Sequence, residues 1–303
     1  MLCLLSLCVW MACHPGSSKA PKILLILIAI LIFGPISETI MNAESDRFPF
    51  KFDYFLYLID SHLGVSAFSL ARLFTEWPRP ILFAIYQSLV YAMFLWYVVN
   101  LNLRGGRPGK LLIAYTINFL AGPCLYLIVP ARGPRHAFGP AFPGLNPDVA
   151  PVLVRLGGWP NAIPSLHVST ALLLVLFAGK SRVLSFVAWT YLAGTIAATL
   201  AFEHYLIDLI VAVPFACFAA LSAEAKIRQA LGNLALVLAW LFAIRFATPV
   251  LITYPAVLRL LTFATVGFAG LSMVNGTKGR DDVLLQSIPT EFPCAASTPE
   301  DRG

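Results

Sequence analysis

The hydrophobic residues of this chain form long blocks and rarely alternate with polar residues over short distances. A helix needs about 17 to 25 apolar residues to cross the hydrocarbon core of a bilayer. The pattern therefore predicts an all-α polytopic membrane helix bundle with about eight transmembrane helices, the fourth of which is short. The eight apolar blocks are 23–41, 81–100, 111–130, 165–179, 183–201, 204–222, 231–247 and 256–274.

Composition excludes a soluble globular protein, because 59% of the residues are apolar and only 12% are charged. The net charge of +6 is explained by topology, so we expect no nucleic-acid partner. With the amino terminus inside, the basic residues of the helix ends lie on the cytoplasmic side, as the positive-inside rule requires. These residues are Lys19, Lys22, Arg104, Arg107, Lys110, Lys180, Arg182, Lys226, Arg228, Lys278 and Arg280.

The same topology places three polar segments together on the outer side: the loop 131–163, the start of the fourth helix, and the turn between the fifth and sixth helices. We expect an integral protein of the plasma (inner) membrane with its active site on the outer, or periplasmic, face. We divide the chain into an apolar and basic N-terminal segment 1–22, a membrane domain 23–274 and a disordered polar tail 275–303.

Residues 50–74 carry Asp53, Asp60 and His62 among aromatic and leucine residues. These polar positions make a membrane span improbable, and the segment is predicted to be an amphipathic helix at the membrane interface, with His62 in water. The six cysteines show no CxxC pair and no spacing typical of zinc ligands. We therefore expect no metal ion and no cofactor.

Two histidines lie where apolar helices meet the predicted outer surface, a location in which ionisable groups are costly and usually functional. His204 is followed four residues later by Asp208, a spacing that places both side chains on one face of a helix. A carboxylate bonded to one imidazole nitrogen fixes the tautomer and leaves the other nitrogen free to attack. The pair is therefore a candidate nucleophile with its orienting group.

The second histidine belongs to the stretch NAIPSLHVST, residues 161–170. Pro164 favours a helix start and Ser165 suits the N-cap, so the free backbone N–H groups of the first turn would bind phosphate oxygens. His167 lies in that turn and could give a proton to a leaving oxygen. Upstream, Arg132 and Arg135 follow the third block, and guanidinium groups bind phosphate through paired hydrogen bonds.

Other interpretations of these residues stay open. His167, His204 and Asp208 are also acceptable metal ligands, although a further strong ligand is missing unless His136 serves. A transporter would need charged residues along a membrane pathway, for which Arg245 and Arg259 are the candidates. A catalytically silent binding module is a third alternative.

Three segments resemble the motifs of the type 2 phosphatidic acid phosphatase superfamily, and especially its branch related to inositol phosphorylceramide synthases. They are YLIVPARGPR, IPSLHVST and EHYLIDLIVAVP, and the resemblance covers about residues 50–222. It implies a six-helix membrane core and a metal-free reaction through a phosphohistidine. The roles it implies are nucleophile for His204, orienting carboxylate for Asp208, general acid for His167, and phosphate binding for Ser165, Arg132 and Arg135.

The departures from the family pattern narrow the expectation. Leu166 stands where the widest form of the second motif has glycine, and Ala197 and Ala198 stand where the third motif has Ser-Arg. No Lys or Arg precedes Arg132 by seven residues, where the first motif has lysine. These changes favour the synthase-like, inositolphosphotransferase-like branch.

We therefore expect a metal-independent lipid phosphatase or phosphotransferase. Its substrate would be a membrane lipid phosphate or phosphodiester within the lipid bilayer. A polyprenyl pyrophosphate or phosphatidic acid phosphatase is the alternative within the superfamily, and the sequence does not indicate the oligomeric state.

Overall fold

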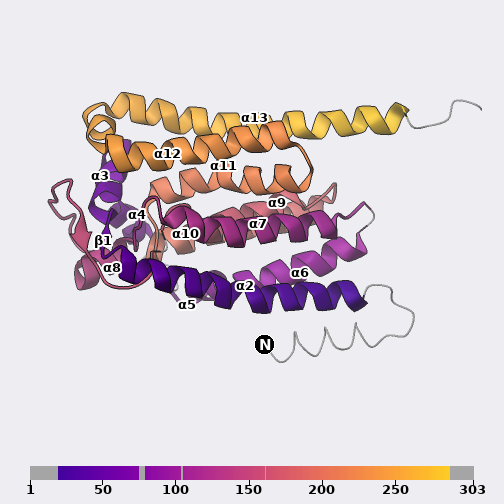
Figure 1. Cartoon of the computed structure of the whole chain (residues 1–303), viewed down its shortest axis with the longest axis horizontal. Helices are drawn as coiled ribbons and strands as arrows, with labels where there is room; N and C mark the ends of the chain where they lie inside the picture. The colour runs from indigo at the N-terminus through magenta and orange to yellow at the C-terminus, as the bar shows by residue number, and fades with distance from the viewer. Residues whose placement is uncertain (1–19, 75–78, 104, 161, 287–303) are drawn as a thin grey trace, which may run out of the picture.

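The computed structural model describes residues 20–74, 79–103, 105–160 and 162–286, and these form the predicted all-α bundle, with its long helices roughly aligned (Figure 1). A single two-residue antiparallel strand pair, β1 with β2, is the only sheet in the described ranges. The elements are α2 (Ala20–Arg47), β1 (Phe50–Lys51), α3 (Asp53–Leu63), α4 (Ala67–Leu73), α5 (Arg79–Gln87), α6 (Leu89–Asn102), α7 (Pro108–Tyr126), α8 (Pro134–Phe138), η1 (Gly139–Ala141), β2 (Val154–Arg155), α9 (Leu166–Leu176), α10 (Arg182–Phe202), α11 (Leu206–Ala223), α12 (Ile227–Thr253) and α13 (Pro255–Gln286).

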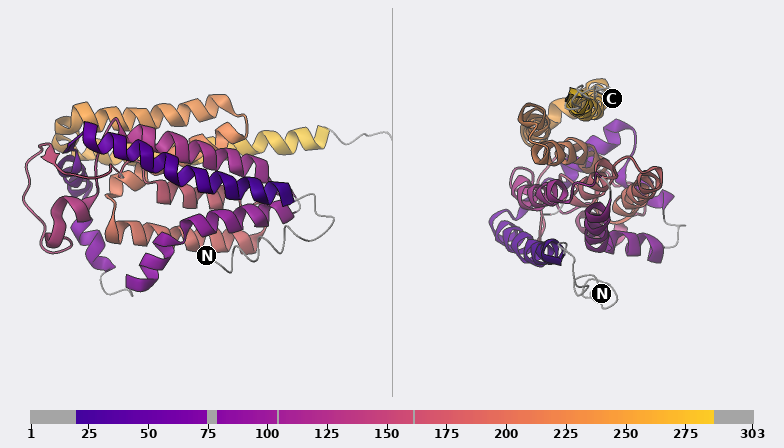
Figure 2. Two further views of the ribbon diagram at one scale, coloured as in Figure 1. Left: turned by 60° about the horizontal axis from the view of Figure 1, so that its bottom comes forward. Right: turned by 90° about the vertical axis from the view of Figure 1, so that its right-hand side faces the viewer.

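Helix α11 is the centre of the bundle and packs against α7, α9, α12, α13 and α3. Its sequence is apolar on every face, as expected for a helix that other helices surround. Viewed end-on, the C-terminal helices lie on one side of the bundle and the indigo α2 lies on the other (Figure 2). Residues at the start of α11 are therefore held by many neighbours.

Each of the eight predicted apolar blocks contains a helix. Four helices among the described residues are long and apolar enough to span a membrane, α10, α11, α12 and the part of α13 up to Val274, and there is a fifth span if α5 and α6 form one that is bent by 55°. The block 165–179 yields α9, which has 11 residues. Helix α13 continues through Gln286, beyond the expected domain limit at 274.

The loops divide between the two ends of the bundle as the charge pattern predicts. One end carries the loop 131–163, the start of α9 and the turn between α10 and α11 (Figure 1). At the other end Arg107 and Lys110 pair with Glu224 at the C-terminal cap of α11. Every polar segment with candidate chemistry is therefore at one end.

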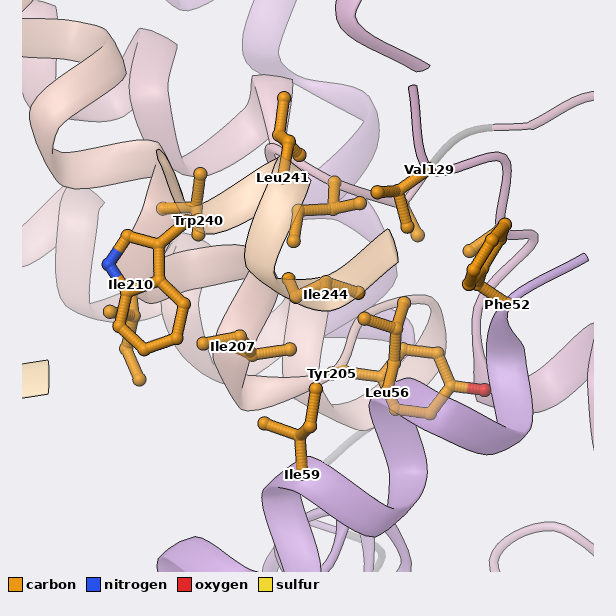
Figure 3. Close-up of a cluster of buried hydrophobic side chains, with 14 of the residues drawn as sticks. Phe52, Leu56, Ile59, Val129, Tyr205, Ile207, Ile210, Trp240, Leu241 and Ile244 are labelled. Atoms are coloured by element: carbon orange, nitrogen blue, oxygen red, sulfur yellow. The ribbon is translucent and has the colours of Figure 1, made fainter. Parts of the chain in front are cut away.

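The segment 50–74 gives no membrane-span candidate among the described residues, and it forms two short helices where a single helix was predicted. It forms α3 and α4, and an apolar cluster from α3, α11 and α12 buries one face of α3 (Figure 3). Asp53 and Asp60 are both fully buried. The prediction missed this because their carboxylates bond backbone N–H groups of segments distant in the sequence. The labelled members of the cluster are Phe52, Leu56, Ile59, Val129, Tyr205, Ile207, Ile210, Trp240, Leu241 and Ile244.

Candidate active site

His204 lies in the turn between α10 and α11 and its side chain is 1% exposed. Its Nδ1 is 3.2 Å from Oδ2 of Asp208. Its Nε2 is buried and has no hydrogen-bond partner among the described residues. A buried imidazole with one nitrogen held by a carboxylate and the other unpaired is the arrangement of an oriented nucleophile.

The contact between His204 and Asp208 is not made along one face of a helix, as their spacing predicts. Tyr205 is the N-cap of α11 and has extended backbone angles, so His204 precedes the helix and does not belong to its face. Asp208, in the first turn, reaches back and accepts a hydrogen bond from the Tyr205 backbone N–H at 2.8 Å. The same carboxylate thus begins the helix and orients the histidine.

Asp60 of α3 holds the first turn of α11 from outside. Its two carboxylate oxygens accept hydrogen bonds from the backbone N–H groups of Leu206, at 2.6 Å, and Ile207, at 2.9 Å. These donors belong to the first turn, where no intrahelical acceptor is available. Burial raises the pKa of Asp60 well above its usual range, and the nearby Asp208 raises it further.

Asp53, at the start of α3, links the arginine loop to the same turn. Its carboxylate accepts hydrogen bonds from the backbone N–H groups of Arg132, at 3.1 Å, and Gly133, at 2.8 Å, and from the Tyr205 hydroxyl at 3.1 Å. Burial raises the pKa of Asp53 to about 6, although these hydrogen bonds lower it. Sequence analysis missed both roles; the available signal was two carboxylates in an otherwise apolar segment of a membrane protein.

Helix α9 begins as predicted, with Ser165 as its N-cap and the Ser165 Oγ accepting a hydrogen bond from the Val168 N–H at 3.4 Å. The Ser165 backbone N–H also donates to the carbonyl oxygen of Asp208 at 3.2 Å. The free N–H groups at the start of α9 are therefore next to the first turn of α11. At its far side α9 is tied to α7, where Asn118 bonds both Ser169 and Thr170.

His167 lies in the first turn of α9, close to His204. Its ring centroid is 6.4 Å from that of His204, and its ring stacks on Tyr86 of α5 with centroids 3.8 Å apart. The two imidazoles come from segments 37 positions apart in the numbering. Rings at this distance are within the range of direct ring–ring contact, so the two imidazoles can act on the same small group.

Arg132 lies beside the turn that carries His204, because the next residue, Gly133, passes very close to the backbone of that turn. Gly133 has φ +94, and a Cβ there would be 1.9 Å from the carbonyl oxygen of Glu203, so only glycine fits. The Arg132 Nε is buried without a hydrogen-bond partner in the described residues. Arg132 lines a cavity of about 190 Å³ together with His136, Gly158 and Trp159.

Arg135 and His136 lie further out, around Glu203. The His136 Nε2 is 3.1 Å from the Glu203 Oε2, and the Arg135 Nη1 is 3.8 Å from the Glu203 Oε1. The Arg135 side chain is 57% exposed and lines a wider hollow of about 1060 Å³ that also includes Arg79. The structure therefore brings Ser165, His167, His204 and Asp208 together, places Arg132 beside them, and leaves Arg135 at the rim.

The residues of the metal and transporter interpretations have other partners in the structure. Within the described ranges, no group of three His, Cys, Asp or Glu side chains could share a metal ion. Arg245 donates to the Ile128 carbonyl oxygen and lies over the Phe52 ring. Arg259 donates to the His62 carbonyl oxygen. Both arginines thus bond backbone of neighbouring segments.

A comparison with protein-family models gives a match to the PAP2 superfamily over residues 55–222, which is more than half of the chain. Neither the search of curated proteins nor the search of solved structures found a match. All six predicted site residues lie inside the matched region, and the family match supports a membrane lipid enzyme of the phosphatase or phosphotransferase type. The chain belongs to the PAP2 superfamily.

Proposed function

We propose that this integral membrane protein cleaves the phosphoester bond of a lipid phosphate or phosphodiester through a covalent intermediate on His204. The observation that carries the proposal is the buried His204, whose Nδ1 contacts Asp208 while its Nε2 has no partner within the part of the chain that the structure describes. Such a ring is held in one orientation, so less of the entropy of alignment is lost when phosphorus approaches. Arg132 supplies a half-buried guanidinium next to the same turn, and its Nε is buried without a hydrogen-bond partner among the described residues.

In the first step the Nε2 of His204 attacks phosphorus and the bond from phosphorus to the leaving oxygen breaks. Arg132 and the free N–H groups at the start of α9 stabilise the charge on the equatorial oxygens, and the Ser165 N-cap aligns that turn. His167, which the bound phosphate anion would keep protonated, gives its proton to the leaving alcohol. The products are a phosphohistidine, a neutral alcohol and a neutral His167.

In the second step an acceptor hydroxyl attacks the phosphohistidine. His167 takes the proton of that hydroxyl while the bond between nitrogen and phosphorus breaks, which restores His204. Water as acceptor gives a phosphatase, whereas an alcohol gives a phosphotransferase. Neither step uses a metal ion.

Leu166 supports the inositolphosphotransferase-like proposal for the substrate. Its side chain packs against Gly122 of α7, where an added Cβ would be 2.3 Å from the leucine Cδ2. Leucine at this position of the second motif thus matches a glycine on the neighbouring helix. We propose a phosphodiester lipid as substrate and an outer-face site on the plasma membrane, because Arg107 and Lys110, which we assign to the cytoplasmic side, lie at the opposite end of the bundle.

The test uses the purified full-length protein in detergent with chelator present. Labelled phosphatidic acid, polyprenyl pyrophosphate, and phosphatidylinositol with ceramide are offered separately, and phosphate release and headgroup transfer are measured. We expect activity that survives chelator, is lost in His204→Ala and persists in His62→Ala, the matched control at the same end of the bundle. Activity that is unchanged in His204→Ala would refute the mechanism, and loss with chelator would revive the metal alternative.

A further inference from the structure

A third cavity adjoins the candidate site. It has a volume of about 230 Å³, and His167 forms part of its wall. The other walls come from α2, α5, α6, α7 and the start of α9, with Met41, Leu89, Phe119 and Leu166 among the lining residues. We name this cavity the side slot.

The interior of the side slot offers few polar groups. Ser37 lines it, but its hydroxyl already donates to the carbonyl oxygen of Phe119 at 3.2 Å. Tyr86 presents its ring, which stacks on His167. The surface is thus suited to hydrocarbon, with the imidazole of His167 as the ionisable group in its wall.

The side slot opens laterally at the bend between α5 and α6. Gln87 and Val90 are exposed lining residues on either side of Ser88, where the two helices meet at 55°. The bend is held by the Ser88 hydroxyl, which bonds the Ile85 carbonyl oxygen and the Tyr191 hydroxyl. Val90 is an exposed apolar side chain at this opening and would contact lipid in a membrane protein, so a lipid chain would enter there.

We propose that the side slot holds the hydrocarbon chain of the substrate, next to the phosphoester oxygen that His167 protonates. This inference rests on the proposed function. Because His167 lines the side slot, the leaving oxygen is the one attached to the lipid, and the phospho-headgroup is the part transferred to His204. The volume accepts roughly eight groups the size of a methylene or a water molecule, at about 30 Å³ each.

One wall of the side slot comes from α2, which lies outside the region that matches the family. Ser37 and Met41 form one wall, yet α2 precedes residues 55–222, the region that matches the family. Phe33 of α2 stacks on Phe119 of α7 with ring centroids 5.7 Å apart. This contact and the Ser37 hydrogen bond fix α2 against α7, so the width of the side slot is set by packing.

The test compares phosphate monoesters and phosphodiesters that carry butyl, octyl or hexadecyl chains in detergent, using two tryptophan variants of α2. Met41→Trp narrows the side slot, whereas Ile36→Trp, the matched control, places the same ring at an exposed position of the same helix. We expect kcat/KM to rise from butyl to octyl and then level off in the wild type and in Ile36→Trp. In Met41→Trp the ratio of octyl to butyl kcat/KM should fall about tenfold.

A second readout does not require turnover. An octyl phosphate with a photoreactive group at the end of its chain should label peptides of α2 or α6 in the His204→Ala protein. Equal chain-length ratios in both tryptophan variants, or labelling elsewhere, would overturn the side slot while leaving His204-dependent activity intact. Absence of His204-dependent activity on every substrate would instead overturn the proposed function, and the side-slot assignment with it.

Discussion

Substitution of Asp60 by alanine tests how the turn that carries His204 is held in place. The Asp60 carboxylate accepts hydrogen bonds from the backbone N–H groups of Leu206 and Ile207, two and three residues after His204. Asp60→Ala removes both acceptors, and the side chain it replaces is fully buried. The Ile207 donor is buried and the Leu206 donor is partly buried, so water compensates incompletely for the lost acceptors.

The size of the effect follows from these two bonds. A buried donor without a partner costs about 1–3 kcal/mol, so two cost about 2–6 kcal/mol. Burial also disfavours the charged Asp60 carboxylate, in line with its raised pKa. Asp60→Ala removes this unfavourable burial, which offsets part of the cost of the two unpaired donors. We expect a net loss of about 2 kcal/mol, or roughly 5 °C in Tm. Displacing His204 by about 1 Å would lower kcat about 100-fold.

The assay measures kcat and KM for phosphate release together with Tm in detergent. Asp60→Asn keeps one acceptor oxygen and should be intermediate in both quantities, with KM little changed. Ser61→Ala is the matched control on the same helix, because the Ser61 hydroxyl bonds only the Tyr57 carbonyl oxygen of its own helix among the hydrogen bonds observed. Wild-type kcat in Asp60→Ala, or an equal loss in Ser61→Ala, would refute the capping role.

Three further predictions concern the arginine loop and its anchor. Gly133→Ala should lower kcat about 100-fold, because the added Cβ would be 1.9 Å from the carbonyl oxygen of Glu203. The control is Gly139→Ala, which is also at positive φ but has no atom within 4 Å of the added Cβ, and its effect on kcat should be much smaller. Arg132→Lys should lower kcat/KM by about tenfold or more, because lysine cannot form the paired hydrogen bonds of a guanidinium to the substrate phosphate. An equal loss in Arg135→Lys, at an exposed position, would contradict the assignment of phosphate binding to Arg132. The pKa of Asp53 is raised from 3.8 to about 6, so the folded state holds this proton to a higher pH than the unfolded state does. The free energy of unfolding should therefore fall by about 3 kcal/mol as pH rises from about 4 to about 6. Thermal melts of Asp53→Asn should lack this pH dependence, and an unchanged pH dependence would contradict the assignment to Asp53.

Several elements of the site follow from local chemistry alone. Ser165 is the N-cap of α9 because a serine side chain accepts a hydrogen bond from an N–H of the first turn, whatever surrounds it. The contact between His204 and Asp208 follows from their four-residue spacing, although the chain makes it at a helix start and not along a helix face. Local spacing fixes which side chains can meet and leaves their backbone geometry open.

The roles of Asp53 and Asp60 could not be inferred in this way. Their partners lie 80 and 146 residues away along the chain, and those partners are backbone N–H groups, which carry no sequence signature. A carboxylate in an apolar segment is compatible with water at the membrane surface as well as with a buried anchor. The packing of α3 against α11 and α12 decides between them.

The sequence by itself determined the membrane class, the helical architecture, the grouping of the polar segments at one end and the identity of the candidate reactive residues. These properties depend on composition and on spacings within one segment, and hydrophobic burial imposes them locally. Only the tertiary structure decided that Arg132 lies beside the histidines while Arg135 is at the rim. It also decided that Asp53 and Asp60 hold the turn that carries His204, and that α2 lines the side slot. Each of these depends on where helices far apart in the chain come into contact.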